Sequence, residues 1–397
     1  MTKADKEGQR KAPILRFKGF TNAWEQRQLG KQNKITMGQS PSSKNYTDNP
    51  KDWILIQGNA DLKSGKVAPR IYTSQLTKKA DIGDIILTVR APVGEVAITD
   101  YDAVLGRGVA AIKGNLFIYF ALEKFKANNK WNMYSSGSTF DSITGKDLNN
   151  LPLFFPSETE ENKIGVLLNK LDNLLALYAK KSSCLDSCIA YFIRILYDDP
   201  QFFKQKNVQN SIIKSFKLDD ILIKNNAKNK DLSILNVESI SNKKGFISQK
   251  EQFDNYQVAS KDLSNYYVIH PKDFAYNPSR INVGSIAYKS PNDVKGIVSP
   301  LYVSFKCKND IVLDKYLWHW FKSTNFEHQR VRLSEGGVRD ILSFNQLSKM
   351  KISIPSFEIQ RQTINLLEIL IQYKEEVDLK LNNLKLIKNT LLQSMFL

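Results

Sequence analysis

The stretch that decides the fold is residues 164–196, IGVLLNKLDNLLALYAKKSSCLDSCIAYFIRIL. Its apolar residues recur at alternating spacings of four and three, interrupted only by Ser182, and neither Pro nor Gly occurs after Gly165. This pattern predicts one continuous helix with a coiled-coil seam. The predicted seam positions are Ile164, Leu168, Leu171, Leu175, Tyr178, Leu185, Ile189, Phe192 and Leu196.

A seam of this kind needs a partner helix, and the far end of the chain carries the same spacing. Lys374 and Lys388 occupy intervening positions in this second seam. We therefore expect the two helices to pair as an antiparallel coiled coil. The apolar positions of the second helix are Leu367, Leu370, Val377, Leu381, Leu384 and Leu391.

The two helices are the ends of an internal repeat. Each follows a strand-like segment and a Pro-Ser pair, at Pro156-Ser157 and, 199 residues later, at Pro355-Ser356. Upstream, Arg90-Ala-Pro-Val-Gly94 resembles Arg280-Ile-Asn-Val-Gly284, 190 residues later. Solenoid units are about 20–50 residues long, so a period of this length indicates a duplicated domain.

Before each of the long helices, short β-branched and aromatic runs bounded by Gly, Asp and Pro predict strands, and each set of strands is followed by a shorter helix. The fold class that we predict is α+β: two similar mixed α/β domains separated by two long paired helices, with pseudo-twofold symmetry. The predicted strands and helices are Trp53–Ile56, Ile85–Val89, Val96–Ile98, Val109–Ile112 and helix Leu116–Asn128, then Leu232–Val237, Tyr266–Ile269, Ser285–Tyr288, Leu301–Phe305 and helix Lys315–Lys322. The expected boundaries are 1–23 for an N-terminal segment, 24–156 for the first domain, 157–200 for the first helix, 201–215 for a linker, 216–355 for the second domain and 356–397 for the second helix.

Composition limits the possible functions. The 397 residues allow two or three domains, and 57 Lys and Arg against 40 Asp and Glu give a net charge of +17. This balance favours nucleic acid over a membrane as partner, although a Lys-rich and Asn-rich proteome raises charge without function. The three cysteines indicate a reducing compartment, with Cys184 and Cys188 as buried or half-buried thiols rather than metal ligands. No run of about 20 apolar residues suits a membrane span, so we expect a cytoplasmic protein.

Candidate DNA contacts are basic and aromatic residues in segments rich in Gly and small hydroxyl side chains. Arg clamps phosphates and reads guanine edges, and Gly336-Gly337 in the segment 329–340 lets a backbone approach closely. A solvated loop with ordinary surface charge is the alternative for any single Arg. Arg90 and Arg280 suggest either shared phosphate contacts or a shared structural role, which we favour at this point. The candidates are Lys44, Tyr46, Arg70, Arg107 and Tyr134 in the first domain and Lys289, Arg330, Arg332 and Arg339 in the second.

Tandem copies of the order domain–helix can pair about a local twofold axis, which makes the helices antiparallel and sets the domains at opposite ends. The seam of residues 164–196 would be about 50 Å long at about 1.5 Å per residue. Two reading domains would then lie about one to one and a half DNA turns apart. We therefore expect an asymmetric, two-part DNA site with an unread gap.

Taken together, these residues resemble the specificity subunit of type I restriction–modification enzymes over essentially the whole chain. The most specific parts are Pro13–Phe20 with Trp24, Pro156-Ser157 leading through Glu160-Glu161 into the first helix, and Pro355-Ser356 leading through Ile359-Gln360 into the second. The family usually has a Glu-Gln pair there, and each copy keeps one member. The resemblance implies two target-recognition domains that read double-stranded DNA and helices that dock two modification subunits. It further implies that those subunits, not this chain, hold S-adenosylmethionine to methylate adenine, and that restriction subunits join for cleavage.

Two other classes of function are alternatives. A free-standing DNA methyltransferase or nuclease would need a cofactor loop and an Asn/Asp-Pro-Pro-aromatic motif, and the nearest string, Tyr276–Arg280, lacks the second Pro and the aromatic. Gly58…Gly65-Lys66 has the wrong spacing for a phosphate-binding loop. We therefore expect no catalysis by this chain. A non-catalytic scaffold or repressor would suit the coiled coil, but two basic domains argue for a ligand.

Overall fold

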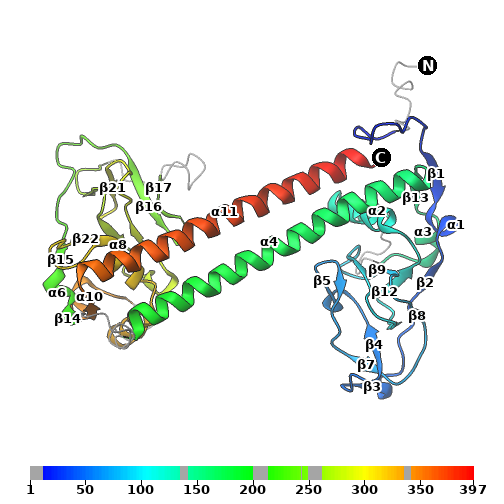
Figure 1. Cartoon of the computed structure of the whole chain (residues 1–397), viewed down its shortest axis with the longest axis horizontal. Helices are drawn as coiled ribbons and strands as arrows, with labels where there is room; N and C mark the ends of the chain where they lie inside the picture. The colour runs from blue at the N-terminus through cyan, green and yellow to red at the C-terminus, as the bar shows by residue number, and fades with distance from the viewer. Residues whose placement is uncertain (1–11, 135–141, 200–212, 243, 249–261, 335–340) are drawn as a thin grey trace. The chain divides into compact units, whose positions relative to one another are not determined.

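A computed structural model of the chain describes residues 12–134, 142–199, 213–242, 244–248, 262–334 and 341–397 (Figure 1). The chain divides into two compact units, unit 1 from Met1–Lys180 with Asp378–Leu397 and unit 2 from Lys181–Val377. The division cuts both long helices. Each unit therefore holds one mixed α/β domain together with part of each helix.

In the described residues of unit 1, the strands form two sheets and one separate strand pair. The first sheet has the order β2-β12-β9-β10-β6-β5, and β9 and β12 are buried along their whole length. The second has the order β3-β7-β4-β11-β8, in which β4 and β11 run parallel. The strands are β1 (Glu25–Gln28), β2 (Ile35–Met37), β3 (Tyr46–Thr47), β4 (Trp53–Ile56), β5 (Leu62–Lys63), β6 (Lys66–Val67), β7 (Tyr72–Thr73), β8 (Lys79–Ala80), β9 (Ile85–Thr88), β10 (Val96–Ile98), β11 (Ala103–Leu105), β12 (Val109–Ile112) and β13 (Pro152–Phe155), which pairs with β1.

Unit 2 repeats this arrangement with fewer strands in its described part. Its sheets have the orders β15-β22-β19-β20 and β17-β16-β21-β18, and β14 pairs with β23. The strands are β14 (Lys214–Lys217), β15 (Leu222–Lys224), β16 (Val237–Ser241), β17 (Gly245–Ser248), β18 (Tyr267–Ile269), β19 (Phe274–Tyr276), β20 (Ile286–Tyr288), β21 (Gly296–Val298), β22 (Val303–Cys307) and β23 (Lys351–Ile354). The shorter helices of the two units are α1 (Leu29–Gln32), α2 (Leu116–Ala127) and α3 (Gly145–Asn149), then α6 (Leu218–Ile221), α8 (Asp314–Trp320), α9 (Thr324–Leu333) and α10 (Phe344–Ser348).

The internal repeat is confirmed at the level of individual hydrogen bonds. The order β2-β12-β9-β10 in unit 1 matches β15-β22-β19-β20 in unit 2. Before β9, the carboxylate of Asp84 accepts from the backbone N–H of Asp81 at 2.9 Å, and before β19 the carboxylate of Asp273 accepts from that of His270 at 2.8 Å. These matches assign counterparts residue by residue: Thr99 lies where Lys289 lies, because their carbonyls accept from the equivalent N–H groups of Gly83 and Lys272.

Each unit has its own aromatic core. In unit 1 Phe117 of α2 packs against Trp24 and Phe155, and Phe396 stacks on Phe117 with ring centroids 4.9 Å apart. In unit 2 the core includes Phe274 and Phe305, whose rings stack at 5.2 Å, with Trp320 of α8 buried in the same cluster. Asn115 caps helix α2, because its Oδ1 accepts from the N–H of Ile118.

The two long helices are α4 (Glu158–Asp198) and α11 (Phe357–Met395), drawn green and orange to red in Figure 1. The prediction of one continuous helix over 164–196 is confirmed. The predicted seam positions Leu168, Leu171, Leu175, Leu185, Ile189 and Phe192 are buried or half-buried, as are Leu367, Leu370, Val377, Leu381, Leu384 and Leu391.

The helices run antiparallel where they pair within a unit. In unit 2, Ile193 and Leu196 of α4 share a core cluster with Leu367, while Asp186, earlier on α4, forms an ion pair with Lys374, later on α11, at 3.3 Å. Residue numbers therefore increase along α4 in the direction in which they decrease along α11.

The starts of the long helices explain the partial Glu-Gln pairs. Glu161 accepts from the side-chain amide of Asn115, which caps α2, and its counterpart Gln360 accepts from the N–H of Leu313, which precedes α8. The preceding position differs. Glu160, 1% exposed, binds Arg16 through two bonds of 2.8 and 2.7 Å, whereas its counterpart is the apolar Ile359, 4% exposed.

Two sequence-based expectations in the second domain are wrong. The strand predicted at Leu232–Val237 begins only at Val237, and Leu232 itself has a positive φ of 55°. The segment from Gln329 was expected to be a loop, but α9 continues to Leu333. Its helical signal lies upstream, where Ser323 caps the helix by accepting from the N–H of Phe326.

Candidate nucleic-acid interface

Three of the five candidates in the first domain, Tyr46, Arg70 and Arg107, are linked by contacts around one residue, and Lys44 lies beside them in the chain. Lys44 is exposed in a turn of 3₁₀ helix directly before Tyr46, the first residue of β3. The hydroxyl of Tyr46 accepts a 2.8 Å hydrogen bond from the side-chain amide of Gln57, which follows β4. Gln57 was not among the sequence-based candidates, because an isolated polar residue after a strand carries no signal of its own.

Gln57 links this edge to Arg70 through a buried carboxylate. The N–H groups of Gln57 and Gly58 both donate to Asp61 Oδ2, at 2.8 and 3.1 Å. Asp61 is 1% exposed, and its other oxygen accepts from Arg70 Nε at 2.9 Å. The Arg70 side chain remains half exposed, so the pair orients its guanidinium at the surface instead of burying it.

Arg107 projects from the tight connection between β11 and β12, beside Gln57. A Cβ added to Gly108 would lie 2.1 Å from the Gln57 carbonyl oxygen, and one on Gly38 would lie 2.0 Å from that of Gly106. Only glycine fits these close approaches. The Arg107 N–H donates to Ser40 Oγ at 3.0 Å and its side chain is exposed. The structure therefore links Tyr46, Arg70 and Arg107 to Gln57, and Lys44 is exposed two residues before Tyr46.

Tyr134 is not part of this set of contacts. Its ring is half-buried against Phe125, with centroids 6.3 Å apart, on the core around α2. The serine, glycine and threonine residues that follow it, at 135–139, lie outside the described residues.

The assignment of Lys289 as a contact at the surface is wrong, because this residue is only 1% exposed. Its ammonium lies 2.7 and 2.8 Å from the two carboxylate oxygens of Glu238 and 5.1 Å from the centre of the Phe246 ring. Asn236 also donates to Glu238, at 3.0 Å. A Cβ on Gly296 would lie 2.7 Å from this carboxylate, so the glycine makes room for the pair. In the described structure Lys289 is therefore an internal charge paired with Glu238.

The three arginines predicted for the following segment differ in position. Arg330 is buried on α9, 5% exposed, and its guanidinium binds Glu327 at 2.7 and 2.8 Å, so its assignment as a surface contact is wrong. Arg332, on the same helix, is exposed. Arg339 lies outside the described residues, as do Gly336 and Gly337. Of the four candidates in the second domain, Arg332 is therefore the one that the structure both describes and exposes.

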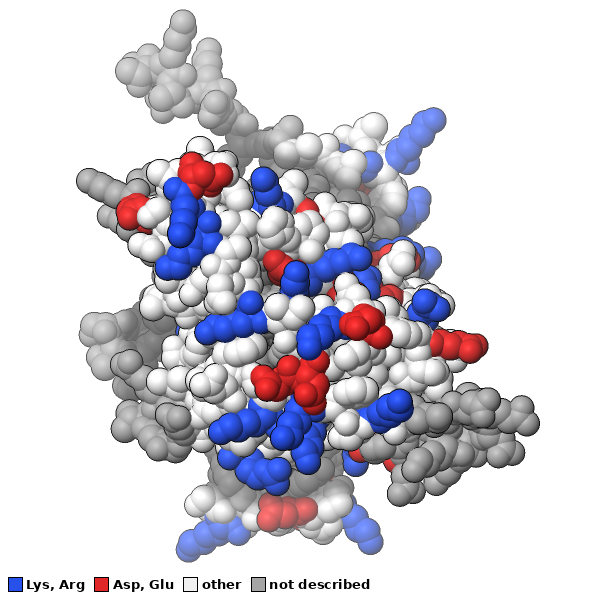
Figure 2. Space-filling view, turned by 90° about the vertical axis from the view of Figure 1, so that its left-hand side faces the viewer, with Lys and Arg blue, Asp and Glu red and all other residues white. Residues whose placement is uncertain are grey.

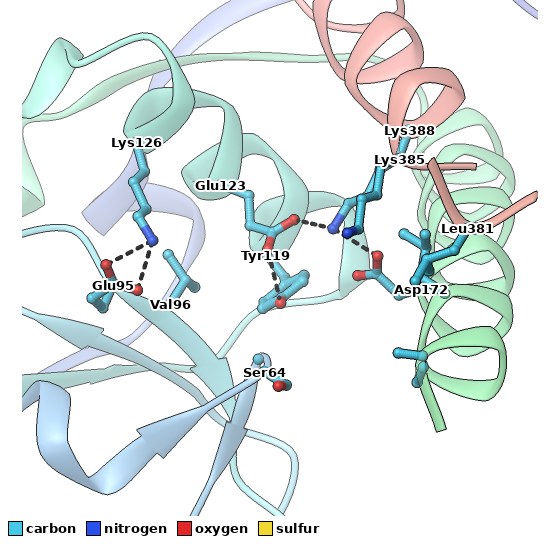
Figure 3. Close-up of a pocket in the computed structure, with 14 residues that line it drawn as sticks. Ser64, Glu95, Val96, Tyr119, Glu123, Lys126, Asp172, Leu381, Lys385 and Lys388 are labelled. Atoms are coloured by element: carbon cyan, nitrogen blue, oxygen red, sulfur yellow. Dashed lines mark hydrogen bonds and ion pairs between the residues drawn. The ribbon is translucent and has the colours of Figure 1, made fainter. Parts of the chain in front are cut away.

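A second polar site joins the long helices to the first domain within unit 1. Lys388 of α11 lies 2.8 Å from Glu123 of α2 and 2.6 Å from Asp172 of α4, so one ammonium bridges three helices (Figure 3). Tyr119 donates to the same Glu123 at 3.2 Å. Burial acts to lower the pKa of Lys388, but Glu123 and Asp172 outweigh it and the pKa is raised. Lys388, predicted at a seam position, is therefore charged and satisfied there.

These residues line one side of a cavity of about 520 Å³ in unit 1. Its opposite side carries Ser64 and the ion pair of Lys126 with Glu95 (Figure 3). The ion pairs of Lys388 with Glu123 and Asp172 connect α2 to the two long helices beside this cavity.

The long helices also carry large apolar side chains on positions outside the seam. In unit 1 the exposed ones on α4 and α11 include Val166, Leu174, Leu177, Leu379, Leu386 and Ile387. In unit 2 they include Tyr191, Leu366, Ile369 and Tyr373. Large apolar side chains exposed at a surface can bind another protein.

Other surface features are less specific. On the face shown in Figure 2, Lys and Arg side chains are spread among a smaller number of Asp and Glu. Among the described residues, no group of three or more His, Cys, Asp or Glu could hold a metal ion, and no described helix is both long enough and apolar enough to cross a membrane. Cys184 is exposed, contrary to expectation, while Cys188 is half-buried.

Comparison with known proteins gives a family for both copies of the repeat. A family model described as type I restriction modification DNA specificity domain matches residues 21–187 and again residues 210–386. The type I restriction enzyme MjaX specificity subunit of Methanocaldococcus jannaschii is 32% identical over 181 residues, which are 44% of this chain and 42% of that protein. The MjaIX specificity subunit of the same organism is 24% identical over 197 residues, 46% of each protein. The match therefore spans less than half the length of each relative.

Solved structures support the fold over nearly the full length. The S subunit of a type I restriction–modification system from M. genitalium covers 97% of this chain and 99% of its own, with a TM-score of 0.65 at 17% identity. A chain from a study of complex assembly and conformational transition in a type I restriction–modification system covers 94% of this chain and 97% of its own, with a TM-score of 0.54 at 15% identity.

Proposed function

We propose that this chain, which belongs to the type I restriction modification DNA specificity family, selects the DNA sequence on which a type I restriction–modification complex acts. The observation that carries the proposal is the family match over each copy of the repeat. Each domain would read one half of an asymmetric, two-part site in double-stranded DNA. The chain itself would carry out no bond chemistry.

In the first domain, the contacts around Gln57 suit the reading of base edges. Gln and Arg side chains recognise adenine and guanine in the major groove through paired hydrogen bonds. The Tyr46 hydroxyl orients the amide of Gln57, and the glycines around Arg107 hold that residue beside it. Lys44 and Arg70 supply positive charge for neighbouring phosphates. In the second domain, Arg332 is the described candidate for the same task.

The exposed apolar side chains on α4 and α11 would dock the modification subunits. Each unit exposes such side chains on both long helices, so one modification subunit would dock on each unit, giving two in all. Those subunits would supply S-adenosylmethionine and the adenine methyltransferase site, for which the target base must leave the stack. Restriction subunits would join the same complex for cleavage.

The continuous helices would set the length of the unread gap. Inserting one heptad into α4 and one into α11 adds about 10 Å of helix, which should lengthen the gap by about three base pairs. Both half-sites should stay the same. An unchanged gap with an altered half-site would contradict the role of the helices as a spacer.

The test of the proposed function is the methylation pattern of DNA from cells that express this chain with a compatible modification subunit. Single-molecule sequencing should show one gapped motif with N6-methyladenine on both strands. A folded complex that adds no methylation would contradict the proposal, and methylation by this chain without any modification subunit would show that it is itself an enzyme.

A further inference from the structure

Arg90 and Arg280 lie in corresponding turns of the two copies. Each precedes a Val-Gly pair whose glycine has a positive φ, 92° at Gly94 and 83° at Gly284. Beside each turn the same backbone bond recurs: the Ile143 N–H donates to the Val89 carbonyl, and its counterpart Leu342 donates to the Pro278 carbonyl. The second copy has one extra residue, Ser279, before its arginine. The two sequences align again from the arginine to the Val-Gly pair.

Neither arginine side chain has a structural task in the described part of the domain. Both are exposed, and neither forms a side-chain hydrogen bond or ion pair with a described residue. Their backbones alone are tied in: Arg90 bridges to Ser142, and the Arg280 carbonyl accepts from Val283 and Ser285. The structural role that the sequence favoured therefore does not explain why both side chains are arginine.

A different cation that is present in both copies has a structural role, and its contacts differ from those of the two arginines. Lys113, which follows β12, binds Asp81 at 2.6 Å and lies 3.7 Å from Asp84. Its counterpart Lys306 is close enough to Asp273, the counterpart of Asp84, to interact with its buried carboxyl. This retained cation has an acidic partner within its own domain, whereas Arg90 and Arg280 have none among the described residues.

The surface next to these arginines has changed between the copies. The N–H of Val89 donates to the Gly108 carbonyl at 2.8 Å, so Arg90 lies beside the connection that carries Arg107. In the second domain the equivalent connection has the same length, since Tyr302 donates to Ser299 as Val109 donates to Gly106. There, Pro300 replaces Arg107 and the exposed Leu301 replaces Gly108.

We expect a side chain that is present in both copies, while its neighbours differ, to contact something that the two half-sites have in common. Two different base sequences share the phosphodiester backbone, not their base edges. We propose that Arg90 and Arg280 are matched phosphate contacts that set the position of each domain on the duplex without contributing to sequence choice. This inference rests on the proposed function, because it presupposes that both domains bind DNA.

The experiment measures DNA binding and methylation by the complete complex with modification subunits. Arg90→Ala and Arg280→Ala should each lower the slope of log affinity against log salt by about one, and the double variant by about two. Arg→Lys at the same positions should retain most of the slope, because a phosphate contact needs charge more than geometry. Lys31→Ala is the matched control, since Lys31 is an exposed cation whose counterpart is Asp220.

The methylated motif, determined by single-molecule sequencing, should be identical in all these complexes. A changed base in either half-site would overturn the assignment by making the arginine a base reader. Loss of complex assembly at unchanged helix content would overturn it in favour of a contact with the modification subunit. An Arg→Lys variant that folds and keeps the motif but loses the full slope would also contradict it. Absence of any motif with the unaltered chain would count against the proposed function itself.

Discussion

The two domains of the chain share a framework but not a surface. Their sheets have matching strand orders, and the Asp84 and Asp273 turns are built from the same bonds. The exposed connection after β11 carries Arg107, while its counterpart carries Pro300. Bonds within the backbone framework have been retained, and side chains at one edge have diverged. The comparison separates what holds each domain together from what distinguishes their ligands.

The two copies also differ in their interiors. Each copy buries an ion pair at a place where the other copy has an uncharged residue. Where unit 2 buries the pair Glu238–Lys289, unit 1 has the apolar Ile56 and the neutral Thr99. Where unit 1 buries Glu160 with Arg16, unit 2 has Ile359. The same framework thus accepts either a buried ion pair or uncharged side chains at a given place, and for Glu238 and Lys289 both partners differ between the copies.

The largest expected effect comes from breaking the buried pair of unit 2. Glu238→Gln leaves the Lys289 ammonium buried without its counter-charge and should lower the free energy of unfolding by about 3–5 kcal/mol. Hydrogen exchange during urea unfolding should show the loss in unit 2 and not in unit 1. The double variant E238I/K289T, which installs the residues of unit 1, should recover most of it. Glu25→Gln, at an exposed pair with Arg27, is the control and should change stability by less than about 1 kcal/mol. Equal losses in the single and double variants would contradict the paired exchange.

A somewhat smaller effect is expected at the start of α4. Arg16→Leu removes both bonds to Glu160 and should lower the free energy of unfolding by about 3 kcal/mol, because the carboxylate stays buried. Adding Glu160→Ile, the residue of the second copy, should restore most of the stability. Thermal unfolding measures both changes, and protease sensitivity of the N-terminal segment should rise only in the single variant. Were Arg16→Leu neutral, the buried pair would have no structural role.

The difference between the two surfaces can be tested by removing the side chains that are candidates for reading bases. Arg107→Ala should relax one position of one half-site, and Arg332→Ala one position of the other, each at a cost of about 1–3 kcal/mol in discrimination. Pro300→Ala should leave the motif unchanged, because Pro offers no side-chain donor. Sequencing of methylated DNA measures all three. If both arginine variants altered the same half-site, each domain would not read its own half.

The smallest effect concerns acid stability in unit 2. Glu368 of α11 lies 3.1 Å from the buried His319 of α8, and hydrogen bonding to His319 and then Lys315 lowers its pKa from 4.5 to about 2. A lowered carboxyl pKa stabilises the fold above pH 4.5, and this contribution is lost as pH falls from about 4.5 to about 2. Because Glu368 is partly exposed, about 1 kcal/mol is expected.

Glu368→Gln should flatten the pH dependence of unfolding between these values, measured in the full chain by circular dichroism. An equally steep dependence in the variant would mean that other carboxyl groups cause it. Unit 1 makes its corresponding link between α2 and the long helices through Lys388 and Glu123, so its hydrogen exchange should be unaffected by Glu368→Gln.

Local periodicity and the internal repeat made much of this fold predictable. The four-three spacing from Ile164 to Leu196 marks α4 because a seam leaves its pattern in neighbouring residues. Lys289 was misassigned because its partner Glu238 is 51 residues away, and no local pattern announces a buried pair. Arg330 was misassigned because α9 was taken for a loop, which hid the face that it shares with Phe326. Gln57 was missed because its role depends on Tyr46 and Gly108, which only the folded chain brings beside it.

The core of the first domain has a consequence for the order in which the protein can fold. Leu392, Met395 and Phe396 belong to that core, and the Lys124 ammonium donates to the Phe396 carbonyl at 2.8 Å. A ribosome delivers these residues only after 181–377 have been made. Unit 2 is one continuous stretch and can close as soon as it emerges, whereas unit 1 must wait with Phe117 uncovered. The domain that is made first is therefore completed last.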